Sequence, residues 1–189
     1  ELGKINPKNF VLNKFALRLA AVQEQLKTGI GFTLISGLPV KELAPEIYSA
    51  VFCGLGSYLG KARSQNAAGH LLGHVRDTGA SAKDPLVRIY QTSARQTFHT
   101  DRSDAVGLLC IKEAKEGGDS LLASSVTAFN ELMAKSPHLA RELMLPVAYD
   151  RRGEIPIGQK PYMTIPVVNW YRGKLTCIYQ REYIISAQR

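Results

Sequence analysis

The order of the hydrophobic patterns along this chain constrains its fold more than any other feature. In the first third, apolar residues recur at helical spacing, at Phe15, Leu19, Val22 and Leu26. Gly29 is a C-terminal stop for that helix, and a second helix is predicted from Pro45, a typical first-turn residue, to near Gly60. From Gly69 onward the patterns shorten to strand lengths. Helices followed by strands are typical of an α+β domain, not of alternating strand and helix units.

Short apolar runs predict the strands and one further helix. The predicted strands are 30–35, 71–75, 86–91, 106–111, 120–123, 163–168 and 175–179. The Gly117-Gly118 pair between two of them predicts a hairpin, and 171–174 reads as a turn between the last two. Ser125 is placed to cap a helix that carries Phe129, Leu132 and Met133. No repeat or linker interrupts the chain, so residues 1–189 are predicted to form a single domain.

The tripeptide His99-Thr100-Asp101 is the most informative motif. On an extended strand, residues two apart point to the same side, so the imidazole and the carboxylate can converge on one metal ion. Two histidines and one carboxylate hold Fe(II) in this manner and leave positions open for a cosubstrate and oxygen. Taken alone, the motif also suits a histidine at a strand end that is hydrogen-bonded to a nearby Asp.

Five ordered blocks, which together span nearly the whole chain, resemble the TauD/TfdA family of Fe(II)- and 2-oxoglutarate-dependent dioxygenases, in a branch frequent in fungi and bacteria. The blocks are 31–39, 98–101, 117–120, 149–156 and 183–189. The resemblance implies a double-stranded β-helix (jelly roll) with N-terminal helices. It also implies Fe(II), 2-oxoglutarate as cosubstrate, and hydroxylation of an unactivated C–H bond of a small-molecule substrate.

The same resemblance suggests which side chains form the site. His99 and Asp101 match the family's metal ligands, and Ser120 stands where the family often has a Thr hydroxyl that binds the 2-oxoglutarate carboxylate. Four residues near the metal segment are candidates for contact with a polar or anionic substrate: Tyr90, Gln91, Arg95 and Phe98. Phe98 would line the pocket, or alternatively would lie in the core.

The family's third metal ligand and its 2-oxoglutarate-binding Arg lack counterparts here. After Asp101 the chain contains one histidine, His138, which is expected to be exposed or to cap a helix. The C-terminal strands that carry the distal His and Arg are therefore expected to be missing from these 189 residues. The alternative from another functional class is a non-catalytic jelly-roll fragment or pseudoenzyme with a binding or structural role.

His70 and His74 form a rival metal motif. Their spacing of four would suit zinc on a helix, but the general-base Glu of an H-E-x-x-H motif is absent and Gly73 disfavours a helix. On a strand the two would share one face, either toward a cavity or as half-buried histidines. Gly54 and Gly56 superficially suggest a phosphate loop, but they lie late in a predicted helix and are interpreted as close-packing positions.

Composition excludes several classes. The formal charge of +8 would suit nucleic-acid binding, but the basic residues are scattered, so nucleic acid is not an expected partner. No apolar run is long enough to span a bilayer, so no membrane association is expected either. The three cysteines, Cys53, Cys110 and Cys177, are interpreted as reduced core thiols, which favours a cytoplasmic location. The oligomeric state is not indicated.

Overall fold

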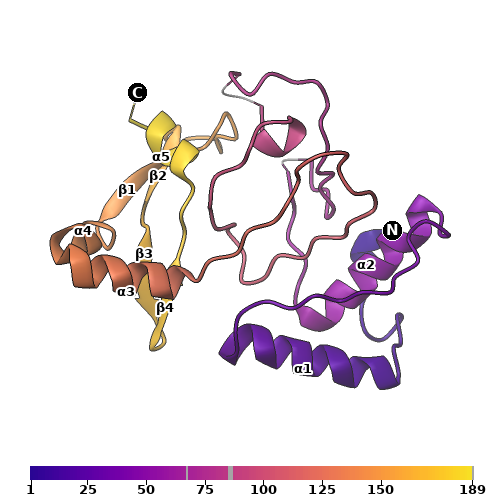
Figure 1. The fold of residues 1–189 in the computed structure, drawn as a ribbon. Coiled ribbons are helices and arrows are strands. Elements are labelled where there is room, and N and C mark those ends of the chain that lie inside the picture. Colours follow the sequence, from indigo (N-terminus) through magenta and orange to yellow (C-terminus); the bar gives the residue numbers. More distant parts are fainter. Residues whose placement is uncertain (67, 85–86, 189) are drawn as a thin grey trace. The chain divides into compact units, whose positions relative to one another are not determined.

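A computed structural model describes residues 1–66, 68–84 and 87–188. The chain divides into two compact units. Unit 1 comprises Glu1–His74 and Ser103–Gly118, and unit 2 comprises Val75–Arg102 and the residues from Asp119 onward. Figure 1 shows the order of the elements along the chain. The predicted site residues from Tyr90 to Asp101, and Ser120, all belong to unit 2.

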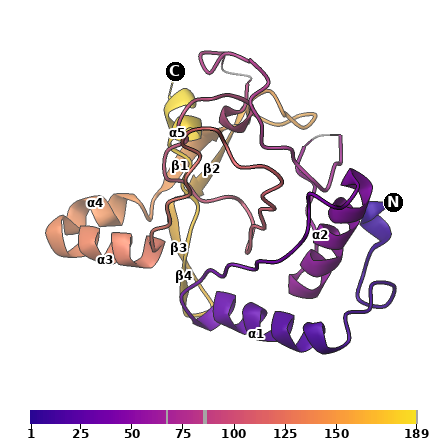
Figure 2. The ribbon, with the colours of Figure 1, turned by 45° about the vertical axis from the view of Figure 1, so that its right-hand side comes forward.

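Unit 1 contains the two predicted helices, which are confirmed. α1 spans Lys14–Thr28 and α2 spans Pro45–Leu59; the two pack against each other (Figure 2), and a short 3-10 helix, η1, spans Leu2–Lys4. Leu19 of the predicted apolar face is fully buried. A Cβ added to Gly54 would lie 2.5 Å from the Phe10 ring, which confirms the interpretation of this glycine as a close-packing position.

Unit 2 contains short helices and two antiparallel hairpins. α3 spans Ser125–Lys135, α4 spans Pro137–Glu142, α5 spans Arg181–Ser186, and the 3-10 helix η2 spans Ile89–Gln91. β1 (Pro146–Asp150) pairs with β2 (Tyr162–Pro166), with Ala148 opposite Thr164. β3 (Val168–Tyr171) pairs with β4 (Lys174–Cys177). The turn at Arg172-Gly173 has φ of 49° and 76°, the backbone that a two-residue hairpin loop requires.

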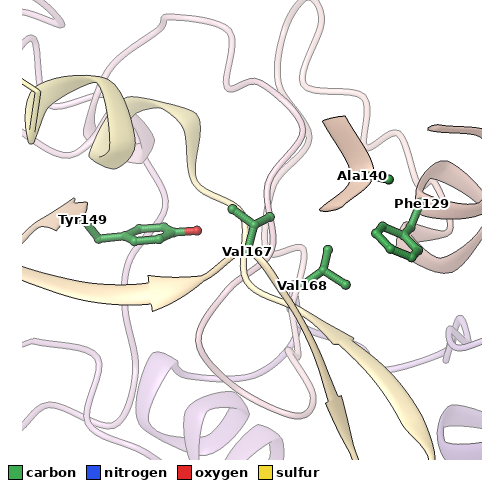
Figure 3. Close-up of a cluster of buried hydrophobic side chains, with 5 residues drawn as sticks. All are labelled: Phe129, Ala140, Tyr149, Val167 and Val168. Atoms are coloured by element: carbon green, nitrogen blue, oxygen red, sulfur yellow. The ribbon is translucent and has the colours of Figure 1, made fainter. Parts of the chain in front are cut away.

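The core of unit 2 lies where helices and hairpins meet. Its buried members, drawn in Figure 3, are Phe129, Ala140, Tyr149, Val167 and Val168. Val167 lies between β2 and β3, and Val168, the first residue of β3, donates a backbone hydrogen bond of 2.9 Å to Leu143 O. The predicted helix around Phe129 is confirmed, although its N-cap is Ser124, whose hydroxyl accepts from Thr127 N at 3.1 Å, and not Ser125.

Several strand predictions are wrong. Segments 30–35, 71–75, 106–111 and 120–123 contain no strand, and the described part of 86–91 contains η2 instead; residue 86 lies outside the described residues. Gly117 and Gly118 do adopt the positive φ of a turn, but the runs on either side belong to no sheet. A strand needs a hydrogen-bonded neighbour. Without one, the apolar side chains of these segments stay exposed; Leu34 is 89% and Leu108 is 74% accessible.

The two later strand predictions are confirmed near β2 and β4. β1 was missed, and so was β3 apart from its first residue, Val168. The described residues thus combine helices with two separate two-stranded sheets. This arrangement is consistent with the α+β class, but it does not amount to a complete double-stranded β-helix.

The three cysteines are all free, but they are not all core residues. Cys110 is exposed, whereas Cys53 and Cys177 are partly buried, and burial raises the pKa of both thiols. The prediction of a core position is therefore wrong for Cys110, which lies in one of the unpaired segments. Within the described residues, every helix is too short or too polar to span a membrane.

Candidate functional site

Thr100 anchors the metal motif to the chain that follows β4. Its backbone N–H donates to Tyr179 O at 2.8 Å. Its hydroxyl accepts from Tyr179 N at 2.8 Å and donates to Cys177 O at 3.2 Å. Thr100 is partly buried, whereas His99 and Asp101 on either side of it are more exposed. Three hydrogen bonds therefore fix the middle residue of the motif and leave the two flanking side chains accessible.

The His99 ring is held in one tautomer. Nδ1 lies 2.8 Å from Thr97 O, and because a carbonyl can only accept, Nδ1 carries the proton. In the neutral ring, Nε2 then has its lone pair available, and it lies 3.1 Å from Nε2 of Gln96, which can donate to it. A histidine that binds metal through one nitrogen commonly donates its other N–H to a backbone carbonyl. His99 has this arrangement, with Nδ1–H bonded to the Thr97 carbonyl and Nε2 available.

His99 and Asp101 lie close enough to approach a single ion. His99 Nε2 is 3.8 Å from Asp101 Oδ1, and the two side chains are 29% and 48% exposed. Ligands about 2.1 Å from one ion at right angles are roughly 3.0 Å apart, so a side-chain shift of less than about 1 Å would be enough. Imidazole nitrogen and carboxylate oxygen are suitable donors for Fe(II). The structure brings the pair together, and a shared metal remains a prediction.

A third protein ligand is absent from the described residues, in which no group of three or more His, Cys, Asp or Glu is placed to hold a metal. His138 is exposed in the first turn of α4, as expected. His70 and His74 are exposed and lie outside any helix or strand, so their interpretation as half-buried strand residues is wrong. Nδ1 of His70 lies 2.9 Å from the side-chain nitrogen of Asn66, so the His70 ring makes a hydrogen bond within its own loop.

The other predicted site residues are dispersed. Ser120 is exposed in the irregular segment before α3, and among the described contacts no hydrogen bond joins it to the metal pair. The Gln91 side chain stabilises η2, because its Oε1 accepts a hydrogen bond from Arg88 N at 3.2 Å. Tyr90 lies in the same 3-10 helix. Arg95 is exposed. Phe98 is 53% exposed, so the alternative of a core position for it is wrong.

Sequence reasoning missed a group of basic and aromatic side chains in unit 2, named here the arginine–tyrosine cluster: Arg88, Arg102, Arg152 and Tyr183. The guanidinium carbons of the three arginines lie 5.5, 5.7 and 4.9 Å from the centroid of the Tyr183 ring, respectively. Burial lowers the pKa of Arg102, and the positive charges of Arg88 and Arg151 lower it further. The members come from four segments far apart in sequence, so no spacing pattern could have predicted the cluster.

Tyr149 lies between this cluster and the segment that anchors Thr100. Its side chain is fully buried, and its hydroxyl donates to Ile178 O at 2.5 Å. Burial raises the pKa of Tyr149 to about 12; Cys177 also raises it, while Arg102, 5.9 Å from the ring centroid, lowers it. The hydroxyl is therefore a fixed hydrogen-bond donor at neutral pH.

Comparison with known proteins gives a consistent family. The family model described as "Taurine catabolism dioxygenase TauD, TfdA family" matches residues 1–188. FR-33289 synthase from Streptomyces rubellomurinus is 31% identical over 176 residues, covering 93% of this chain and 52% of that protein. Taurine hydroxylase-like protein SAT17 from Stachybotrys chartarum is 30% identical over 185 residues, covering 94% of this chain and 47% of that protein.

A shorter match is to uridine-5'-phosphate dioxygenase from an Amycolatopsis species, which is 38% identical over 74 residues, covering 35% of this chain and 27% of that protein. The chain spans about half the length of the two curated relatives that it matches most extensively.

Proposed function

The chain belongs to the TauD/TfdA family of dioxygenases, and on that premise we propose that it is part of an Fe(II)- and 2-oxoglutarate-dependent oxygenase that hydroxylates a C–H bond of a small-molecule substrate. The observation that carries the proposal is the geometry of His99 and Asp101. One ring nitrogen of His99 is occupied by a carbonyl, and the other lies 3.8 Å from a carboxylate oxygen.

In this proposal, His99 Nε2 and Asp101 hold Fe(II), and Thr100 keeps the two side chains on the accessible side of their segment. When bound, Fe(II) and 2-oxoglutarate would supply the oxidant for the C–H bond. In the neutral His99 ring, the hydrogen bond to the Thr97 carbonyl places the proton on Nδ1 and leaves the lone pair of Nε2 available to a metal. Gln96 would release its contact with Nε2 as the ion enters.

The remaining parts of the site follow the pattern of the family. Ser120 would donate a hydrogen bond to the 2-oxoglutarate carboxylate, and Tyr90, Arg95 and Phe98 would contact substrate. The third metal ligand and the cosubstrate-binding Arg would come from outside these 189 residues. We also expect the complete domain to be a double-stranded β-helix, in which the exposed apolar runs at 30–35 and 106–111 would gain strand neighbours.

The relatives suggest the kind of substrate. One of them is named for uridine-5'-phosphate, a small, polar molecule that carries an anionic group, and another is named as similar to taurine hydroxylase. A small polar substrate would suit the exposed position of Arg95.

The test uses the protein at its full natural length. Fe(II) and 2-oxoglutarate are added without oxygen, and the visible charge-transfer band of the iron chelate is recorded; succinate is measured after air is admitted. His99→Ala should abolish both signals. His138→Ala is the matched control, since its exposed side chain lies on α4, and it should leave them unchanged.

A non-catalytic binding role is the second candidate, because the described residues contain no group of three ligands for a metal and the proposed third ligand lies outside them. A full-length protein that gives neither band nor succinate would support that role against the oxygenase.

A further inference from the structure

The carboxylate of Asp101 depends on the residues on either side of it for its position. Among the described contacts, the Asp101 side chain approaches only His99, with Oδ1 3.8 Å from Nε2. Thr100 fixes the backbone before Asp101, through its hydrogen bonds to Cys177 and Tyr179. The backbone after Asp101 makes no such hydrogen bond among those described. Its position on that side therefore depends on a contact of another kind.

The side chain of Arg102 supplies that contact. Its guanidinium carbon lies 5.9 Å from the centroid of the Tyr149 ring and 5.7 Å from that of the Tyr183 ring, and Nη1 donates to Met163 Sδ at 3.7 Å. A guanidinium within about 6 Å of an aromatic ring is attracted by its electrons, and its planar shape suits stacking. Arg102 as a residue is exposed, but its three partners are buried or partly buried in β1, β2 and α5. The end of its side chain is therefore attached to the ordered part of unit 2.

The contacts alternate along residues 99–102. Thr100 and Arg102 contact the hairpins and the chain after them, whereas the described contacts of His99 and Asp101 are with each other and with their own segment. Arg102 is also the last residue of this segment in unit 2, since Ser103 belongs to unit 1. Asp101 therefore lies between two residues that are held by unit 2, directly before the chain leaves that unit.

We propose that Arg102 is a positioning residue for the metal pair: stacked on Tyr149 and Tyr183, it holds the backbone after Asp101 so that the carboxylate stays within reach of His99 Nε2. This inference rests on the proposed function, in which the pair binds a divalent metal. The charge of Arg102 alone gives the opposite expectation. A guanidinium one residue from a metal ligand repels the cation, so a role through charge predicts tighter metal binding when Arg102 is removed. A positioning role predicts weaker binding.

Titration of the full-length protein with Co(II), followed by visible absorption and without 2-oxoglutarate, measures metal binding independently of turnover. Arg102→Met keeps a long, unbranched side chain but loses the stacking on two rings, so it should weaken Co(II) binding about five- to thirtyfold. Tyr183→Leu removes one of the rings and keeps the charge of Arg102, and it should weaken binding about two- to fivefold. Arg141→Met is the matched control, because it removes one positive charge at an exposed position of α4, and it should leave the affinity unchanged.

Amide hydrogen exchange of the metal-free protein gives a second measurement. The Thr100 N–H, which donates to Tyr179 O, should exchange faster in Arg102→Met than in Arg141→Met, while the amides of β1 and β2 keep their rates. Equally faster exchange throughout β1 and β2 would indicate a general loss of stability and overturn the positioning role, as would Co(II) affinity in Arg102→Met that equals or exceeds that of wild type. If the wild type itself binds no Co(II), the proposed function fails; local loosening at Thr100 would then still support the anchor, and unchanged exchange would overturn it.

Discussion

The substitution Thr100→Val tests directly whether the Thr100 hydroxyl anchors the segment that contains His99 and Asp101. Valine keeps the β-branched shape and removes the hydroxyl, which accepts from Tyr179 N at 2.8 Å and donates to Cys177 O at 3.2 Å. Each hydrogen bond contributes about 0.5–1.5 kcal/mol net, so the two together are worth roughly 1–3 kcal/mol. The longer bond and the partial exposure of Thr100 favour the lower half of that range. The backbone bond from Thr100 N to Tyr179 O remains.

Urea unfolding of the full-length protein measures the loss of stability, and anaerobic iron titration measures the consequence for the metal pair. Loss of support outside the ligands commonly reduces metal affinity about ten- to a hundredfold. Thr97→Val is the matched control, because the Thr97 side chain is exposed and its carbonyl, which holds His99, is unaltered. Thr100→Ser, which keeps the hydroxyl, should recover most of the iron affinity. If Thr100→Val matches Thr97→Val in both stability and iron affinity, the anchoring argument is refuted.

Three further predictions follow from the same contacts. Burial raises the pKa of Tyr149 in the folded protein to about 12 from an ordinary value of 10, so its contribution to stability is present below about pH 10 and is lost as pH rises toward 12. In urea unfolding, the free energy of unfolding should therefore fall more steeply with rising pH above 10 for wild type than for Tyr149→Phe, and equal slopes would contradict this. Ser120→Ala should weaken the binding of 2-oxoglutarate about ten- to a hundredfold in a titration of the full-length protein. An unchanged affinity would show that Ser120 is a surface residue that does not bind the cosubstrate. These 189 residues alone, with Fe(II) and 2-oxoglutarate, should give no stoichiometric charge-transfer band; such a band would show a third ligand within the chain.

The helices were predictable because their signals are local. The apolar spacing around Leu19, with Gly29 at the end, is contained within one helix and needs no distant partner. The turn between β3 and β4 was predictable for a similar reason, since the Arg172-Gly173 pair determines its own geometry, although β3 itself was not predicted. The runs at 30–35 and 106–111 have strand-like composition as well, but pairing depends on a neighbour elsewhere in the chain. Their composition therefore could not decide the outcome.

The same distinction applies to the candidate site. His99 and Asp101 were predicted to share one face of a strand, but the structure places residues 99–101 outside any strand. Their side chains nevertheless lie 3.8 Å apart at Nε2 and Oδ1, and their role as metal ligands stays a prediction. The arginine–tyrosine cluster required Arg88, Arg152 and Tyr183 to meet across about a hundred residues of sequence. Nothing in the spacing of the arginines along the sequence indicated that three of them lie over one tyrosine ring.

The anchoring of Thr100 also explains how the fold of unit 2 controls a pair of exposed side chains. Among the described contacts, neither His99 nor Asp101 bonds to a side chain from the core; His99 bonds to its own segment, through Thr97 and Gln96. The pair therefore moves with the segment. Thr100 ties that segment to Cys177 and Tyr179, and the intervening carbonyl, that of Ile178, accepts from the buried Tyr149 hydroxyl. Because Tyr149 belongs to the hydrophobic core, core packing supports the position of the His99–Asp101 segment through residues 177–179.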